Sequence, residues 1–310
     1  MSATGFFSGG FKVLIARLIA DMEGVETRLD AAMQACAAAD MPVAMAGLLD
    51  FCGDVLQLSL PHGDRAQLTA ILVEQFGECD LLVADHEIEI PRLFVSDMDS
   101  TMIGQECIDE LADYAGIKDQ VAAITERAMQ GELDFTSALK ERVGLLEGLE
   151  ESAIDRCLRE RIRPVEGART LAATLRSKGC RTVLVTGGFH HFADPVAQDL
   201  GFERVVGNRL GVAGGKLTGL LAGPVSDAST KLATLEDERT GLGDGARVLA
   251  TGDGANDIPM LQAADYGIAY RAKPKARDAA NGRIASAGLT PILKLFGIPE
   301  SEWVEEFSPA

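Results

Sequence analysis

The sequence predicts an α/β protein: a parallel, Rossmann-like sheet with helices on both faces in residues 91–310, preceded by a smaller α+β domain in residues 1–90. Two observations support this fold class. The length of 310 residues is enough for two domains. Beyond residue 91, short apolar runs end in polar or glycine-rich turns and alternate with helical segments, which is typical of a parallel sheet buried on both faces. These runs cover residues 93–96, 182–185, 248–250 and 266–269.

The first 90 residues show a different order of elements. We expect strands at residues 13–19, 41–49, 54–60 and 81–90, and helices at residues 23–39 and 64–76. Asp64 can cap the second helix, and Gly77 can end it. The order β-α-β-β-α-β predicts a ferredoxin-like domain, with Pro91 as the link to the rest of the chain.

A helical insertion is expected between the first and second strands of the parallel sheet, over roughly residues 105–163. Its helices break at Gly116, Gly131 and Gly148, and Pro164 closes it. Ligands bind at the carboxyl ends of the strands in open α/β sheets. An insertion at this point therefore predicts a cap over the ligand site.

Composition excludes several classes of partner. Lys and Arg total 29 and Asp and Glu total 47, which gives a net charge of −18. That charge repels nucleic acid and anionic membrane surfaces. No apolar run approaches the roughly 18 residues of a membrane span. The six cysteines are scattered without a Cys-x-x-Cys pair and the four histidines show no zinc pattern, so we expect reduced thiols and a cytoplasmic protein.

Two carboxylates follow the first apolar strand, in the stretch Asp97-Met98-Asp99-Ser100-Thr101. Side chains two residues apart project to the same side of an extended chain, and crowded carboxylates are costly without a cation. One use of such a pair is division of labour, in which Asp97 attacks a phosphorus atom and Asp99 protonates the leaving oxygen. The alternative is two solvated loop aspartates.

A second acidic group follows the third apolar strand, in Gly252-Asp253-Gly254-Ala255-Asn256-Asp257. Oxygen ligands suit Mg²⁺, which also binds a substrate phosphate oxygen. If the two strands are neighbours, Asp97 and Asp253 would form a carboxylate pair for the metal. A plain turn is the alternative.

Two further features suit a phosphate group. Thr186-Gly187-Gly188 offers a hydroxyl and backbone amides at a strand end, and Lys231 lies near a helix start, where a cation opposes the helix dipole unless it faces an anion. Alone, the glycines would be an ordinary turn and the lysine an ordinary surface residue.

The helical insertion carries four candidates for contacts to the rest of a substrate. Arg142 can bind a carboxylate through two hydrogen bonds, Glu106 can hold an ammonium group, and Met129 and Phe135 can exclude water. Each could equally be ordinary helix surface or core. The pair His190-His191 suggests no chemistry and is expected to begin a helix.

Taken together, these motifs resemble those of the phosphoserine phosphatases of the haloacid dehalogenase superfamily. The order of the four core motifs matches, and the resemblance spans roughly residues 93–290. The insertion matches too, through Glu106, Ala128-Met129-x-Gly131-x-Leu133-x-Phe135 and Lys140-Glu141-Arg142-Val143. One departure is Thr186, where the family usually carries serine.

The resemblance implies hydrolysis of O-phospho-L-serine to L-serine and phosphate through an aspartyl-phosphate, the last step of serine biosynthesis. In the roles that the resemblance implies, Asp97 is the nucleophile and a Mg²⁺ ligand, and Asp99 is the general acid/base, with its backbone carbonyl on the metal. Asp253 is a metal ligand, and Asp257 supports the metal's waters. Thr186, Gly187 and Lys231 bind the phosphoryl group, and Asn256 orients this cluster. Glu106 and Arg142 bind the amino and carboxylate groups of serine.

The N-terminal domain matches less specifically. Some bacterial members of the family carry an ACT-like domain there, and the expected strand and helix order is compatible with one. A homodimer is one arrangement such a domain would serve, with plain stability as the alternative. Two rival functions stay open: a phosphatase or phosphotransferase for another small metabolite such as phosphohomoserine, and a catalytically silent amino-acid sensor.

Overall fold

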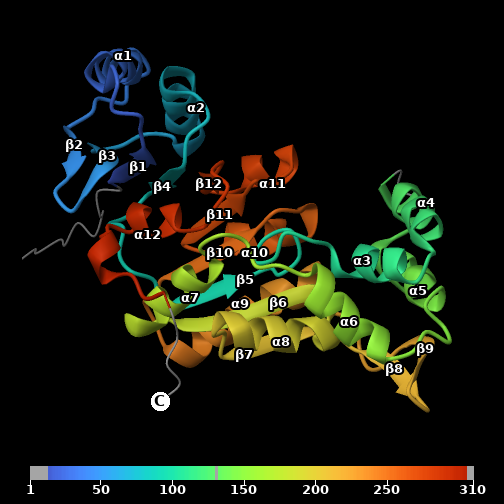
Figure 1. Cartoon of the computed structure of the whole chain (residues 1–310). Helices are drawn as coiled ribbons and strands as arrows, with labels where there is room; N and C mark the ends of the chain where they lie inside the picture. Colours follow the sequence, from blue (N-terminus) through green and yellow to red (C-terminus); the bar gives the residue numbers. More distant parts are fainter. Residues whose placement is uncertain (1–12, 130–131, 306–310) are drawn as a thin grey trace, which may run out of the picture.

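The computed structural model describes residues 13–129 and 132–305, and Figure 1 shows a single long sheet flanked by helices. The sheet has ten strands in the order β2-β3-β1-β4-β12-β11-β10-β5-β6-β7. Strands β12 to β7 run parallel to one another, and β2 to β4 pair antiparallel. The α/β class expected from the apolar runs is therefore confirmed.

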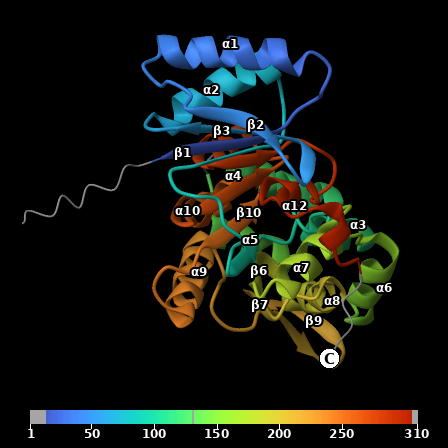
Figure 2. The ribbon, with the colours of Figure 1, turned by 90° about the vertical axis from the view of Figure 1, so that its left-hand side faces the viewer.

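The N-terminal part follows the expected β-α-β-β-α-β order. Its elements are β1 (Leu14–Ile19), α1 (Val25–Ala38), β2 (Met45–Leu49), β3 (Cys52–Leu60), α2 (Arg65–Phe76) and β4 (Leu81–Ala84). Asp64 caps α2 by accepting a hydrogen bond from the backbone N–H of Gln67 at 2.8 Å. Helices α1 and α2 lie side by side on one face of these strands (Figure 2) and enclose a separate apolar core.

One expected strand is too long. The alternating stretch up to Ile90 predicts a strand over residues 81–90, but β4 ends at Ala84. The backbone N–H of Glu89 donates to the hydroxyl of Tyr266 at 2.9 Å instead of to a neighbouring strand. A side chain therefore satisfies the extended backbone there, and alternation alone could not reveal this.

The remaining elements build the parallel part of the sheet and its covers. They are β5 (Leu93–Ser96), α3 (Cys107–Tyr114), α4 (Lys118–Met129), α5 (Phe135–Gly144), α6 (Ser152–Arg161), α7 (Ala168–Ser177), β6 (Arg181–Phe189), α8 (His190–Leu200), β7 (Arg204–Asn208), β8 (Leu210–Ala213), β9 (Lys216–Leu221), α9 (Ala228–Leu242), β10 (Val248–Gly252), η1 (Ala255–Asp257), α10 (Ile258–Ala263), β11 (Tyr266–Tyr270), α11 (Pro274–Ala279), β12 (Gly282–Ile284), α12 (Pro291–Leu295) and η2 (Glu300–Glu302).

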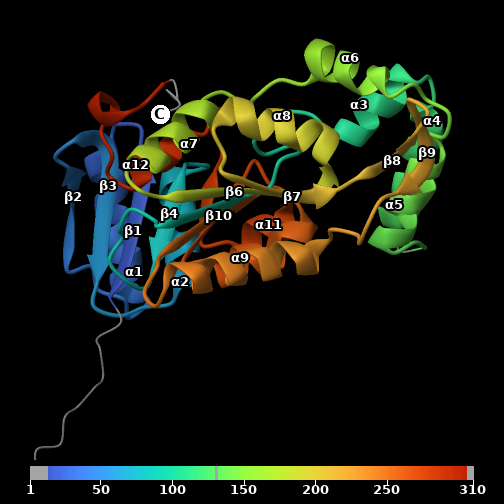
Figure 3. The ribbon, with the colours of Figure 1, turned by 90° about the horizontal axis from the view of Figure 1, so that it is seen from below.

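Helices cover both faces of this part of the sheet. Figure 3 shows α7 and α8 on one face and α9 on the other. Helices α3 to α6 fill the insertion between β5 and β6, and with the β8–β9 hairpin they lie at the end of the molecule away from α1 and α2 (Figure 1). As expected, α8 begins at His190. Strands β7, β8, β9 and β12 were not expected from the sequence.

A buried carboxylate ties two strands of the sheet to a covering helix. Glu238 on α9 is 8% exposed, and it accepts hydrogen bonds from Arg181 on β6 and from Arg204 on β7, the latter at 2.5 Å. Burial raises the pKa of Glu238, but the two guanidinium groups outweigh burial and hold it below its ordinary value.

The expected boundary near Pro91 is not an open linker. Pro91 is buried, and β4 pairs antiparallel with β12 through Leu82 and Gly282. Asp80 also accepts hydrogen bonds from the backbone N–H groups of Ala285 at 2.8 Å and Ser286 at 3.1 Å. The N-terminal strands thus extend the catalytic sheet, and the division into two domains stays a prediction.

All six cysteines are free thiols, as expected for a reduced protein. Within residues 13–129 and 132–305, no helix combines the length and the apolar character needed to cross a bilayer.

Candidate active site

The two acidic motifs meet because their strands are neighbours. Strands β5 and β10 pair in parallel, with Ser96 opposite Thr251, so the residues after each strand emerge at the same edge of the sheet. The backbone N–H of Asp97 donates to the carbonyl of Thr251 at 2.9 Å, and the side-chain hydroxyls of Ser96 and Thr251 lie 2.8 Å apart. These bonds hold the start of the Asp97 loop against the strand that leads to Asp253.

Lys231 lies at the centre of the acidic group. Asp227 caps α9 in a capping box, which places Lys231 in the first turn with its side chain 1% exposed. Its Nζ is 2.6 Å from Oδ1 of Asp97 and 2.6 Å from Oδ1 of Asp257. Burial would lower the pKa of Lys231, but the two carboxylates outweigh burial and raise it above its ordinary value. The surface-lysine alternative is therefore wrong.

Asp257 is buried, and its carboxylate also holds the backbone of the preceding loop in place. Its second carboxylate oxygen accepts hydrogen bonds from the backbone N–H groups of Asp253 at 3.2 Å and Gly254 at 3.0 Å. Gly252 has no room for a side chain, because a Cβ there would lie 2.4 Å from Cγ of Asp257. Asp257 therefore fixes the loop that presents Asp253.

The carboxylates are too crowded to be balanced by Lys231 alone. Burial, followed by the charge of Asp257, raises the pKa of Asp97 well above its ordinary value and that of Asp253 to about 6. Asp97, Asp253 and Asp257 each offer a ligand oxygen, and these oxygens all lie within 4.8 Å of one another. An all-oxygen set of this kind fits a hard divalent cation, whose charge would relieve the crowding.

Asp99 lies beside this cluster in a different environment. Its Oδ1 accepts a hydrogen bond of 3.3 Å from the backbone N–H of Cys107, at the start of α3. Burial, followed by the charge of Glu106, raises the pKa of Asp99 to about 7. A carboxyl group with this pKa carries a proton for part of the time near neutral pH, as a general acid must.

Thr186, Gly187 and Gly188 lie in the last residues of β6 and not in a separate turn, and polar contacts fix their backbone. The backbone N–H of Gly188 donates to Oγ1 of Thr186 at 2.8 Å, and the Asn208 amide donates to the carbonyl of Gly187 at 2.8 Å. The hydroxyl of Ser226 donates to the carbonyl of Thr186 at 3.0 Å. Neither Asn208 nor Ser226 was expected from the sequence to act here.

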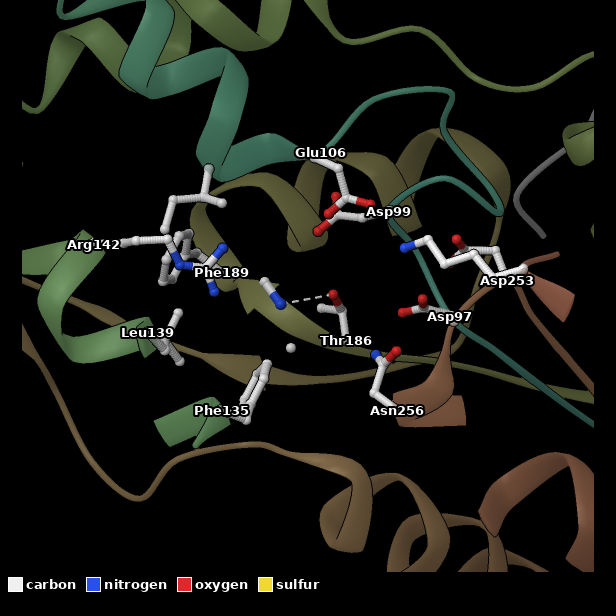
Figure 4. Close-up of a pocket in the computed structure, with 15 residues that line it drawn as sticks. Asp97, Asp99, Glu106, Phe135, Leu139, Arg142, Thr186, Phe189, Asp253 and Asn256 are labelled. Atoms are coloured by element: carbon white, nitrogen blue, oxygen red, sulfur yellow. Dashed lines mark hydrogen bonds between the residues drawn. The ribbon is translucent and has the colours of Figure 1, made fainter. Parts of the chain in front are cut away.

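One cavity of about 240 Å³ is lined by Asp97, Asp99, Asp253, Gly187 and Gly188 from these groups. Figure 4 shows Arg142, Leu139 and Phe135 from the inserted helices at one end of it, and Asp97, Asp253 and Asn256 from the sheet at the other. Glu106 and Thr186 also line it. Lys231 and Asp257 lie behind its wall, and the side chain of Met129 falls outside the described part of the structure.

Glu106 lies beside Asp99, and Arg142 lies at the end of the cavity opposite Asp97 (Figure 4). The hydroxyl of Ser100 donates to Glu106 at 2.8 Å, while Nε of Arg142 donates to the carbonyl of Ala138 in its own helix at 3.3 Å. Burial lowers the pKa of Arg142 somewhat. Its remaining guanidinium donors can take an anionic group of a ligand. Phe189, Leu139, Ile108 and Lys273 also line the cavity, although the sequence did not indicate them as site residues.

A carboxylate cluster at the carboxyl ends of β5 and β10, with a buried lysine and a glycine-rich strand end nearby, is an arrangement that can hold a divalent cation and a phosphate group. Residues 94–262, more than half of the chain, match the haloacid dehalogenase-like hydrolase family, and residues 240–288 match a second family of the same description. The chain belongs to the haloacid dehalogenase-like hydrolases.

Its curated relatives are phosphoserine phosphatases. The enzyme of Archaeoglobus fulgidus is 43% identical over 66% of this chain and 60% of its own length. That of Saccharomyces cerevisiae is 36% identical over 82% of both chains. The chain spans less than two thirds of several of the curated relatives that it matches, with 60% of the Archaeoglobus enzyme and 64% of the phosphoserine phosphatase of Mycobacterium tuberculosis.

Two solved structures show where the similarity lies. A haloacid dehalogenase family hydrolase of Salmonella enterica serovar Typhi is 26% identical, with a TM-score of 0.79 over 92% of this chain and 98% of its own. A substrate-bound phosphoserine phosphatase is 36% identical, with a TM-score of 0.61 over 66% of this chain and 97% of its own. The first match therefore includes most of the N-terminal strands as well.

Proposed function

We propose that this protein hydrolyses O-phospho-L-serine to L-serine and phosphate, the last step of serine biosynthesis. One observation carries the proposal: a single cavity is lined by Asp97, Asp99 and Asp253 and by two inserted residues, with Glu106 beside Asp99 and Arg142 at the end opposite Asp97. The first set suits a phosphoryl group, and the second suits an ammonium group and a carboxylate. The curated relatives named above support the same substrate.

In the proposed first step, Oδ of Asp97 attacks phosphorus and forms an aspartyl-phosphate while the bond from phosphorus to the serine oxygen breaks. Asp99 gives its proton to that leaving oxygen. In the second step Asp99 takes a proton from water, whose oxygen attacks phosphorus and releases phosphate with Asp97 restored.

Charge compensation decides the rate of this chemistry. Two like charges at 4 Å repel by about 4 kcal/mol at an effective dielectric constant of ~20, so an anionic nucleophile needs help to reach a phosphate. We assign Lys231, the Gly187 amide, Thr186 and Asn256 to the phosphoryl oxygens. Mg²⁺, held by Asp97, Asp253 and the carbonyl of Asp99 with Asp257 in support, would supply the remaining positive charge.

The inserted helices would select the substrate. Glu106 is assigned to the amino group and Arg142 to the carboxylate, with Met129 and Phe135 as apolar walls. A Cβ on Gly187 would lie 3.1 Å from Cζ of Phe135, so the inserted helices lie directly over residues 186–188. This contact supports a cap that excludes water during transfer.

The N-terminal strands and helices, residues 1–90, are proposed to form an ACT-like domain beside the catalytic domain of residues 91–310. Strand β2 lies at the free edge of the sheet, with Met45 and nearby Phe51 well exposed. An apolar edge of this kind would serve a homodimer. The free thiols are in keeping with a cytoplasmic location.

Phosphate release from phosphoserine tests the function, with Mg²⁺ and with a chelator. We expect turnover that the chelator abolishes and added Mg²⁺ restores, and almost complete loss of turnover in Asp97→Asn with the fold retained. Turnover of phosphohomoserine at a higher kcat/KM would favour the rival substrate. A folded protein without any phosphatase activity would favour the silent sensor.

Arg142→Ala separates substrate choice from chemistry. Because Arg142 is far from the reacting oxygens, we expect a large loss of kcat/KM on phosphoserine and a small loss on an aryl phosphate that has no carboxylate. Equal losses of kcat/KM on both substrates would show that Arg142 does not bind the carboxylate of phosphoserine.

A further inference from the structure

A second hollow lies where the N-terminal strands join the catalytic sheet. It has a volume of about 220 Å³ and is lined by Arg271, Arg277 and Arg283, with Glu78 across from them. Arg283 lies on β12 and Arg277 on α11, next to β4 and α2 (Figure 1). None of the described residues that line the catalytic cavity lines this hollow.

The charges around the hollow do not balance. Glu78 is the one acidic group among its described lining residues, and it pairs with Nη1 of Arg277 at 3.3 Å. The Glu78 side chain is 72% exposed, so the pair is screened by water. Arg271, which contacts the hydroxyl of Tyr270, and Arg283 have no carboxylate partner among the described residues that line the hollow, in a chain whose net charge is −18.

Arg283 has donors without acceptors. Its Nε and Nη2 are buried and find no hydrogen-bond partner in the part of the chain that the structure describes. It contacts the thiol of Cys79, which is a weak acceptor. Buried guanidinium donors are costly when left unpaired, and a small turn of the guanidinium plane would direct them into the hollow.

Arg271 is held at the hollow by its backbone. It directly follows β11 with a φ of 41°, in the left-handed region that non-glycine residues seldom adopt. Its backbone N–H donates to the carbonyl of Ile284 at 2.9 Å, which keeps it beside β12. Strained residues of this kind persist where the surrounding structure requires them, and they are frequent at ligand sites.

We propose that this hollow binds a small oxyanion, a carboxylate or a phosphate group, through Arg271, Arg277 and Arg283. Guanidinium groups donate parallel hydrogen bonds that match both kinds of oxyanion. Arg283 lies on β12, whereas Cys79 and Glu78 lie just before β4. A bound anion would therefore strengthen the joint between the N-terminal strands and the catalytic sheet.

Thermal unfolding of the full chain tests the proposal, with sulfate titrated against chloride at constant ionic strength. A ligand that binds only the folded state raises the melting temperature in proportion to its occupancy. We expect a saturable rise in the wild type and in Lys275→Gln, which removes one charge from an exposed position on the same helix as Arg277. In Arg271→Gln and Arg283→Gln, half-saturation should need at least tenfold more sulfate.

Three outcomes would overturn the site. If the melting temperature depends on sulfate in the same way in all four proteins, sulfate binds in the catalytic cavity or binds without a specific site. If Lys275→Gln weakens sulfate binding as much as the two arginine variants do, the effect is one of general charge. No rise in the wild type with sulfate, inorganic phosphate or malonate would mean no site. Because Arg271 is exposed, its variant should fold even if Arg283→Gln does not. An arginine-dependent response to malonate alone would identify a carboxylate ligand, and one to sulfate and phosphate alone a phosphate group.

Discussion

Replacing Lys231 by methionine should destabilise the protein strongly, because one buried ammonium group compensates two buried carboxylates. At 2.6 Å and an effective dielectric constant of ~20, each of its ion pairs has a Coulomb energy of about 6 kcal/mol. The cost of burying the three charges offsets most of this attraction. Removing one partner of a buried pair typically lowers the free energy of unfolding by about 3–5 kcal/mol, which is the loss we expect.

Urea unfolding at pH 8 with a chelator present measures this loss without competition from a metal ion. Lys275→Met is the matched control, since Lys275 is exposed and its replacement should change the free energy of unfolding by less than about 0.5 kcal/mol. The deficit of Lys231→Met should shrink as the pH falls. Without Lys231 the pKa of Asp97, already raised, rises further, and protonation then removes the uncompensated charge.

A deficit below about 1 kcal/mol would refute the reasoning, because it would mean that Lys231 does not compensate the cluster. A large deficit that stays constant between pH 8 and pH 5 would point to lost packing of the lysine side chain. In that case the charge argument would fail even though the stability prediction holds.

Two other replacements test the fold. Glu238→Gln should lower the free energy of unfolding at pH 7 by about 1–3 kcal/mol, since Glu238 accepts hydrogen bonds from two arginines. The pKa of Glu238 is lower in the folded state than in the unfolded state, so its stabilisation is present above the unfolded pKa of roughly 4.5 and disappears as the pH falls through the folded pKa. Urea unfolding should therefore show a larger difference between wild type and variant at pH 7 than at pH 3. An equal difference at both pH values would contradict this prediction. Gly267→Ala should lose more than about 3 kcal/mol or fail to fold, because its Cβ would lie 2.0 Å from the carbonyl oxygen of Leu261. Gly241→Ala on α9 has open space and should gain about 0.5–1 kcal/mol in the same assay, and a similar loss in both variants would rule out the steric argument.

The catalytic cluster was predictable because it depends on local pattern and on one rule of topology. Apolar runs identified β5 and β10, and the carboxyl ends of parallel neighbours meet at one edge of the sheet. Asp97 and Asp253 therefore had to come together if the strands were adjacent. The position of Lys231 beside them was harder to predict. Only the conflict of a lysine in the first turn of α9 with the helix dipole, together with the family resemblance, indicated it.

The supporting contacts were harder to predict, because each depends on the path of the chain between elements. The sequence shows that Asp257 is acidic, but not that the backbone N–H groups of Asp253 and Gly254 occupy one of its oxygens. Ser226 reaches Thr186 from a segment forty residues further along the chain. Nothing in the local pattern distinguishes such a serine from an ordinary loop residue.

The joint between the N-terminal strands and the catalytic sheet shows the same limit on a larger scale. Strand β12 has only three residues and contains Gly282 and Arg283, so neither length nor apolar pattern marks it as a strand. It forms because β11 pairs with it on one side and β4 on the other. A strand that exists only through its neighbours cannot be found from its own residues, and for that reason the pairing of β4 with β12 could not be predicted from the sequence.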